Sequence, residues 1–94
     1  MRIKYTERAL SDLAAIHNYV AREWPSGGEK FDARLGEIER RILTFPNGAA
    51  AVEGRTGVFV VPFIRFPFRL FYTIDDNAAV ILHIRNTSRD TWKD

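Results

Sequence analysis

Cysteine is absent from this chain of 94 residues, which excludes disulfide frameworks, thiolate zinc sites and cysteine nucleophiles. Histidine is scarce as well, since His17 and His83 are the only two, and no His-x-x-x-His pair or carboxylate cluster accompanies them. The sequence therefore predicts no metal site. A glycine-rich phosphate loop and a Gly-x-Ser-x-Gly elbow are also missing. We accordingly expect no cofactor, and catalysis by a standard nucleophile has no support.

Long apolar runs are missing too. No segment approaches the ~18 apolar residues of a membrane span, and the N-terminal Met-Arg-Ile-Lys-Tyr lacks the apolar stretch of a signal peptide. We therefore expect a soluble, cytoplasmic protein with no membrane partner. Charge of one sign is also in short supply, because the formal net charge is only +2. Such a slight basic excess suits an anionic partner, but solubility alone is the simpler explanation of it.

The chain does contain enough apolar material for one packed core. Hydrophobic residues make up 46% of the sequence and aromatic residues 13%, so a disordered chain is not expected. A second core could not be built from so few residues. The sequence therefore predicts a single domain that covers residues 1–94.

The N-terminal part indicates a short strand followed by a helix. Residues 2–6 alternate between apolar and polar side chains, which is typical of a strand with one buried face. Thr6 can cap the helix that follows. The pair Trp24-Pro25 ends this helix, because the residue before proline avoids the α region. The predicted apolar stripe of this helix comprises Leu10, Leu13, Ile16 or His17, Val20 and Trp24.

A second helix is predicted directly after the first. Ser26-Gly-Gly-Glu29 has the form of a capping box. Because few residues separate the two helices, we expect them to form an antiparallel hairpin, followed by a surface loop over residues 47–57. The apolar stripe of the second helix comprises Phe31, Leu35, Ile38, Ile42 and Phe45.

Residues 58–86 have the composition of a strand meander, rich in Val, Ile, Phe and Tyr and broken by an Asp-Asp-Asn turn. Strands are predicted over 58–63, 68–74 and 80–86. A one-residue slip would exchange the two faces of each strand. Only one register therefore gives a clean buried face, made of Phe68, Leu70, Tyr72, Ile74, Val80, Leu82 and Ile84. The same register predicts an opposite face made of Arg69, Phe71, Thr73, Ile81, His83 and Arg85.

These elements predict an α+β fold: a short N-terminal strand, an antiparallel helical hairpin, and a three-strand antiparallel meander. The hairpin should pack on one face of a mainly antiparallel sheet. The face that carries the arginines would then be left open to a partner.

The arginines are the candidate binding residues. The planar guanidinium fork suits phosphate and carboxylate groups, because it donates two hydrogen bonds at once. Four arginines lie in or just beyond the meander: Arg65, Arg69, Arg85 and Arg89. His83, on the same predicted face, would be kept neutral by the arginines and could serve as a base; the alternative is a partly exposed strand histidine. His17 is expected to be packed or half-exposed, without a chemical role.

Four motifs resemble those of the RelE/ParE toxins of bacterial type II toxin–antitoxin systems. Residues 65–72, Arg-Phe-Pro-Phe-Arg-Leu-Phe-Tyr, and residues 79–90, Ala-Val-Ile-Leu-His-Ile-Arg-Asn-Thr-Ser-Arg-Asp, are similar to the paired signature of the family. The family also shows Ala-x-x-Asp-Leu-x-x-Ile-x-x-Tyr on its first helix and Phe-Pro-x-Gly near its second. Those two motifs are matched here by Ala9, Asp12, Leu13, Ile16 and Tyr19, and by Phe45, Pro46 and Gly48.

The resemblance implies a toxin, of the kind also called a plasmid stabilisation protein, that arrests growth and is neutralised by a cognate antitoxin from an adjacent gene. RelE-like members cleave messenger RNA on the ribosome without a metal, whereas ParE-like members are not nucleases and poison DNA gyrase. In a nuclease, Arg69 and Arg89 would stabilise the transition state at phosphorus, with His83 as the base. In a ParE-like toxin, the target-binding face would comprise Arg65, Arg69, Arg85 and Arg89.

The departures from the family pattern favour the second mechanism. Asn86 stands where many members carry histidine, and the sequence reaches Asp94 without the distal tyrosine of the RelE type. Trp92 offers only an indole donor, and the basic charge is slight for a protein that must bind ribosomal RNA. We therefore predict a gyrase inhibitor that acts without catalysis. The alternatives are a ribosome-dependent messenger RNA endonuclease and an inactive binding module with the toxin fold.

Overall fold

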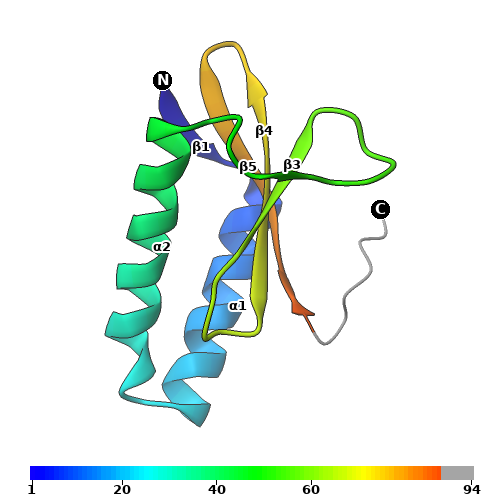
Figure 1. The fold of residues 1–94 in the computed structure, drawn as a ribbon. Coiled ribbons are helices and arrows are strands. Elements are labelled where there is room, and N and C mark those ends of the chain that lie inside the picture. The colour runs from blue at the N-terminus through cyan, green and yellow to red at the C-terminus, as the bar shows by residue number, and fades with distance from the viewer. Residues whose placement is uncertain (88–94) are drawn as a thin grey trace.

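A five-stranded sheet covered on one face by two helices forms the protein. The computed structural model describes residues 1–87, and its elements are β1 (Arg2–Tyr5), α1 (Glu7–Glu23), α2 (Gly27–Thr44), β2 (Ala50–Ala51), β3 (Val58–Pro62), β4 (Phe68–Asp75) and β5 (Ala78–Asn86). The strand order is β1-β5-β4-β3-β2. β1 runs parallel to β5, and the other neighbours are antiparallel. Figure 1 shows the two helices side by side, so the predicted α+β fold is confirmed.

One feature differs from the sequence prediction at the level of whole elements. The predicted surface loop over 47–57 contains β2, a short strand that pairs with β3 and forms one edge of the sheet. The N-terminal strand lies at the other edge, where it pairs with the last strand that the structure describes.

Within residues 1–87, no helix is long and apolar enough to cross a membrane.

The helix ends test the capping predictions. Thr6 caps α1 as predicted, because its Oγ1 accepts a hydrogen bond of 3.0 Å from the Ala9 N–H. The helix ends at Glu23, before the Trp-Pro pair. The capping box predicted at the start of α2 is wrong, since the Ser26 side chain forms no capping hydrogen bond and its backbone is already helical, with φ −79° and ψ −4°. A cap requires an extended backbone at that position.

The core lies between the helices and the sheet. Ile16 and Val20 of α1 are buried, and Phe31 of α2 is fully buried with its ring stacked on Phe63 at a centroid distance of 5.1 Å. Burying each such side chain stabilises the fold by roughly 1.5–3 kcal/mol. Two residues of the predicted stripes are not in the core, because Leu10 and Phe45 are 54% and 64% exposed; at the start of α1 the buried residue is Ala9.

The register of β4 and β5 contains a β-bulge that changes which side chains share a face. Phe71 pairs with His83, but its neighbour Tyr72 pairs with Ile81, so Leu82 is an extra residue in β5. The side chains of Val80 and Ile81 in β5 therefore point to the face opposite the one that the sequence predicted. Ile81 therefore lies in the core, fully buried, and its predicted place on the open face is wrong; Val80, paired with Thr73, is on that face instead.

The C-terminal half of the same register agrees with the prediction. Leu70 pairs with Ile84, and both are buried in the core. Because side chains alternate along a strand, Arg69, Phe71, His83 and Arg85 lie on the face of the sheet opposite Leu70 and Ile84. The β-bulge lies beyond this segment, which is why the simple alternation holds here.

Candidate functional site

Two arginines face one another on the side of the sheet opposite Leu70 and Ile84, which we call the arginine-bearing face. It was predicted to be open, but Phe71 and His83 on it are each only 5% exposed, so it is covered at these two residues. Arg69 of β4 and Arg85 of β5 are directly opposite residues in the antiparallel ladder. Next to them, Phe71 stacks on His83 with ring centroids 6.1 Å apart and an angle of 29° between the rings. Like charges opposite one another destabilise a strand pair. The pair therefore brings two positive charges together on this face.

His83 is the most constrained polar side chain of this face. It is only 5% exposed, and its Nδ1 lies 2.8 Å from Oδ2 of Asp12 in α1. On the other side of the ring, Nη1 of Arg85 lies 3.3 Å from Nε2. The sequence-based alternative of a partly exposed strand histidine is therefore wrong.

These two contacts require one protonation state of the imidazole ring. A guanidinium group can only donate hydrogen bonds, so Nε2 must carry the lone pair that accepts from Arg85. Nδ1 then carries the proton, and its N–H donates a hydrogen bond to the carboxylate of Asp12. Burial lowers the pKa of His83; the carboxylate of Asp12 opposes that shift, and the charges of Arg8 and Arg85 add to it. His83 is thus a neutral ring with both nitrogens hydrogen-bonded.

Asp12 is the site residue that sequence reasoning missed. The sequence motif on the first helix contains Asp12, but only the fold brings it to a histidine that lies 71 residues further along the chain. Together with Arg8 of α1, these residues line a shallow pocket of about 240 Å³ at the edge of the arginine-bearing face; its other lining residues are Ile84, Arg85 and Asn86. No group of three or more potential metal ligands occurs within residues 1–87.

The other predicted site residues lie elsewhere. Arg65 is in the turn between β3 and β4 and lines a separate groove on the helix side of the sheet. The structure therefore does not bring Arg65 together with Arg69 and Arg85. Arg89, like Trp92, lies outside the described residues. His17 is half-exposed, which was one of the two predicted placements, and its Nε2 is 2.8 Å from Oδ1 of Asp32.

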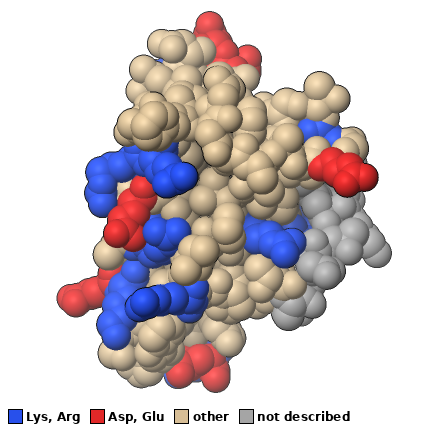
Figure 2. Space-filling view, viewed as in Figure 1, with Lys and Arg blue, Asp and Glu red and all other residues tan. Residues whose placement is uncertain are grey.

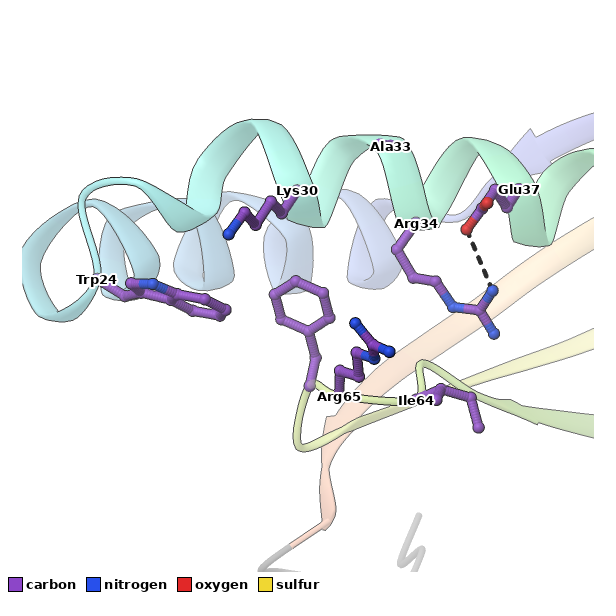
Figure 3. Close-up of a pocket in the computed structure, with 8 residues that line it drawn as sticks. Trp24, Lys30, Ala33, Arg34, Glu37, Ile64 and Arg65 are labelled. Atoms are coloured by element: carbon purple, nitrogen blue, oxygen red, sulfur yellow. Dashed lines mark hydrogen bonds and ion pairs between the residues drawn. The ribbon is translucent and has the colours of Figure 1, made fainter.

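The groove lies between α2 and the β3–β4 turn. It has a volume of about 650 Å³ and is lined by Trp24, Lys30, Ala33, Arg34, Glu37, Ile64, Arg65 and Phe66. Figure 3 shows Lys30 and Arg34 on the side of α2 and Ile64 and Arg65 on the side of the turn. A smaller pocket of about 270 Å³ shares Arg34 and Ile64 with it and extends the groove along α2 to Arg41. In Figure 2 the basic side chains gather over α2.

The turn presents apolar surface at a conformational cost. Ile64 and Arg65 have φ values of 50° and 73°, and a positive φ is unfavourable for a β-branched residue. Ile64 is nevertheless 56% exposed. On the opposite wall, Trp24 packs on Phe66 with ring centroids 5.4 Å apart. A strained turn that holds an isoleucine out to solvent beside two aromatic rings is typical of a contact surface.

Comparison with known proteins establishes the family. The model of the ParE toxin of type II toxin–antitoxin systems, parDE, matches residues 3–91, so the chain belongs to this family of toxins, as the sequence motifs predicted. Toxin RelE2 of Caulobacter vibrioides is 28% identical over 89 residues, which cover 94% of this chain and 97% of that protein.

Solved structures agree with this assignment. The chromosomal ParDE toxin–antitoxin system from P. aeruginosa superposes with a TM-score of 0.78 at 25% identity, over 92% of this chain and 95% of the other. The matching chain in the intact E. coli RelBE toxin–antitoxin complex superposes with a TM-score of 0.65 at 18% identity, over 89% and 93% of the two chains. That second likeness concerns the fold alone.

Proposed function

We propose that this toxin inhibits DNA gyrase by binding to it, without catalysis, and that Arg69 and Arg85 on the arginine-bearing face of the sheet contact the target. Membership of the ParE family supports this target. The observation that carries the proposal is the state of His83, the strongest candidate for a base on this face. Both of its ring nitrogens are hydrogen-bonded within the protein, to Asp12 and to Arg85.

A general base must bring a lone pair within hydrogen-bonding distance of the substrate. The lone pair of His83 on Nε2 already accepts from Arg85, and the ring is almost completely buried. Opening this site for RNA would require Arg85 to leave. The same contacts favour binding. They hold the guanidinium group of Arg85 in place beside that of Arg69, and fixed guanidinium groups recognise carboxylates and phosphates well.

The two mechanisms are separated by adding purified protein to a gyrase supercoiling assay and to a translating ribosome. We expect inhibition of supercoiling and no cleavage of messenger RNA. Arg69→Ala should abolish the inhibition, whereas Arg22→Ala, which removes an exposed arginine near the end of α1, should leave it intact. Cleavage of messenger RNA without an effect on gyrase would refute the proposal, and failure to arrest growth on induction would favour an inactive module.

A second proposal concerns the antitoxin, the partner named with the toxin in the solved ParDE and RelBE systems. We propose that a cognate antitoxin, encoded by an adjacent gene, places an acidic amphipathic segment in the groove beside α2. Four basic side chains and one acidic side chain line the groove and its extension: Lys30, Arg34, Arg41 and Arg65, with Glu37. Apolar side chains of the segment would contact Trp24, Ile64 and Phe66.

The internal contacts of the groove favour a peptide over a nucleotide. Arg34 donates from Nε to the carbonyl oxygen of Phe63 at 2.6 Å, and its Nη1 lies 3.2 Å from the carboxylate of Glu37. Phosphate would have to compete with the backbone carbonyl for Arg34 and would be repelled by Glu37. An amphipathic helix needs apolar pockets and scattered complementary charges instead.

Ile64→Asp tests this groove. An aspartate tolerates a positive φ better than isoleucine does, so the fold should not suffer, but its charge should repel an acidic segment. We expect antitoxin affinity, measured by calorimetry, to fall by about tenfold or more. Leu43→Asp is the matched control, because Leu43 is an exposed aliphatic residue of α2 outside the groove. Equal affinities of the two variants would show that the groove is not the antitoxin site.

A further inference from the structure

Asp12 connects the first helix to one edge of β5. β1 pairs with β5 only as far as Ile81, so within residues 1–87 no strand pairs with this edge of β5 beyond that point. Oδ2 of Asp12 reaches the edge there and accepts a hydrogen bond of 2.9 Å from the Ile84 N–H. The same oxygen accepts the Nδ1–H of His83 at 2.8 Å. One carboxylate oxygen thus fixes both the backbone and the ring.

The ring in turn fixes a guanidinium group. His83 offers Nε2 to Arg85 only while its proton is on Nδ1, and a carboxylate at Nδ1 favours that state because it can only accept. We infer that Asp12 is a positioning residue, which holds His83 in the Nδ1-protonated tautomer and thereby holds Arg85 in its orientation on the target-binding face. This inference rests on the proposed role of Arg85 in binding.

A second histidine–aspartate pair shows what is particular about this one. His17 and Asp32 are also 2.8 Å apart, but their side chains are 47% and 63% exposed. Exposed pairs of this kind contribute little. The side chains of His83 and Asp12 are 6% and 23% exposed, and the pair continues to Arg85. Because the Asp12–His83 pair is buried and His83 also contacts Arg85, Asp12 can position the guanidinium group of Arg85 through the ring. The exposed pair of His17 and Asp32 serves as the control.

The test combines Asp12→Asn with Arg85→Ala in the full chain and uses growth arrest, titrated by inducer dose, as the first readout. The asparagine amide can either accept or donate at Nδ1, so it no longer fixes the proton there. With Arg85 present, we expect Asp12→Asn to raise the inducer dose needed for growth arrest by about tenfold. In the Arg85→Ala background, the same substitution should raise that dose by less than about twofold.

NMR of the histidine ring nitrogens is the second readout, because it reports the tautomer of His83 directly. We expect Asp12→Asn to shift His83 from the Nδ1-protonated tautomer toward a mixture. Asp32→Asn should change neither growth arrest nor the His83 spectrum, since its partner His17 lies outside the site.

Each outcome decides the inference. Loss of arrest that depends on Arg85, together with the change of tautomer, would support it. An equal loss in both backgrounds would mean that Asp12 acts on folding alone, and full activity of Asp12→Asn would also overturn the inference. Wild-type protein that arrests growth without inhibiting gyrase would refute the proposed target. The comparison of Asp12→Asn with and without Arg85→Ala would still show whether the effect of Asp12 depends on Arg85.

Discussion

Two adjacent glycines at the start of α2 provide a matched pair of substitutions. Gly27 is buried under the indole of Trp24, and a Cβ added to it would lie 2.6 Å from Cδ2 and 2.7 Å from Cε3 of that ring. Gly28 has nothing within 4 Å of the equivalent position. Gly27→Ala therefore forces a clash that Gly28→Ala does not, although the two changes have the same chemistry and neighbouring positions.

The magnitudes follow from two opposing effects. Glycine to alanine at a compatible position raises the free energy of unfolding by about 0.4–1 kcal/mol, because the unfolded chain loses freedom. An overpacked methyl group costs about 1–3 kcal/mol, and Trp24 cannot move without losing its contact with Phe66. We expect Gly28→Ala to be slightly stabilising and Gly27→Ala to be less stable than Gly28→Ala by about 1–3 kcal/mol.

Urea unfolding followed by circular dichroism measures this difference, and for a domain of this size each kcal/mol corresponds to a change in Tm of about 4–8 °C. Because Trp24 forms one wall of the groove, Gly27→Ala should also weaken antitoxin binding, whereas Gly28→Ala should not. Equal stability and equal antitoxin affinity of the two variants would refute the packing described for Trp24.

Three further predictions concern the core and its polar contacts. Phe31→Ala removes a fully buried ring and should lower the free energy of unfolding by about 3–5 kcal/mol, whereas Phe45→Ala should change it by less than about 0.5 kcal/mol; both are measured by urea unfolding. Tyr72→Phe removes the 2.5 Å hydrogen bond to the Pro46 carbonyl and should cost about 1–2 kcal/mol in the same assay. Burial lowers the pKa of His83, so the unfolded chain takes up its proton first as the pH falls, and Tm should decrease below about pH 6.5, less steeply in His83→Gln.

Much of the fold could be predicted because its signals are local. The cap at Thr6 and the Trp-Pro pair at Pro25 determine where α1 begins and ends, and each acts through atoms a few residues away. Helical periodicity identified most of the inward side chains of both helices, but it could not show which residues at the helix ends meet the core. Leu10 fits the apolar spacing and is 54% exposed, whereas its neighbour Ala9 is fully buried; Phe45, at the end of the second stripe, is 64% exposed.

The arginine-bearing face shows the limit of strand alternation. Arg69 and Arg85 were placed together correctly because the strands near them pair without interruption. The β-bulge at Leu82 moved Ile81 into the core, and nothing in the local sequence distinguishes a bulged residue from a regular one. Arg65 was grouped with the other arginines because it is close in sequence, yet the β3–β4 turn places it on the helix side.

By itself, the sequence determined the family, the two helices, the strands of the meander and the face that carries Arg69 and Arg85. Only the tertiary structure decided that Asp12 meets His83 and that the ring then holds Arg85. The reason is the range of the interactions. Periodicity and capping act within a few residues, whereas a hydrogen bond across 71 residues exists only in the tertiary structure, where β1 pairs with β5 and α1 packs against that strand.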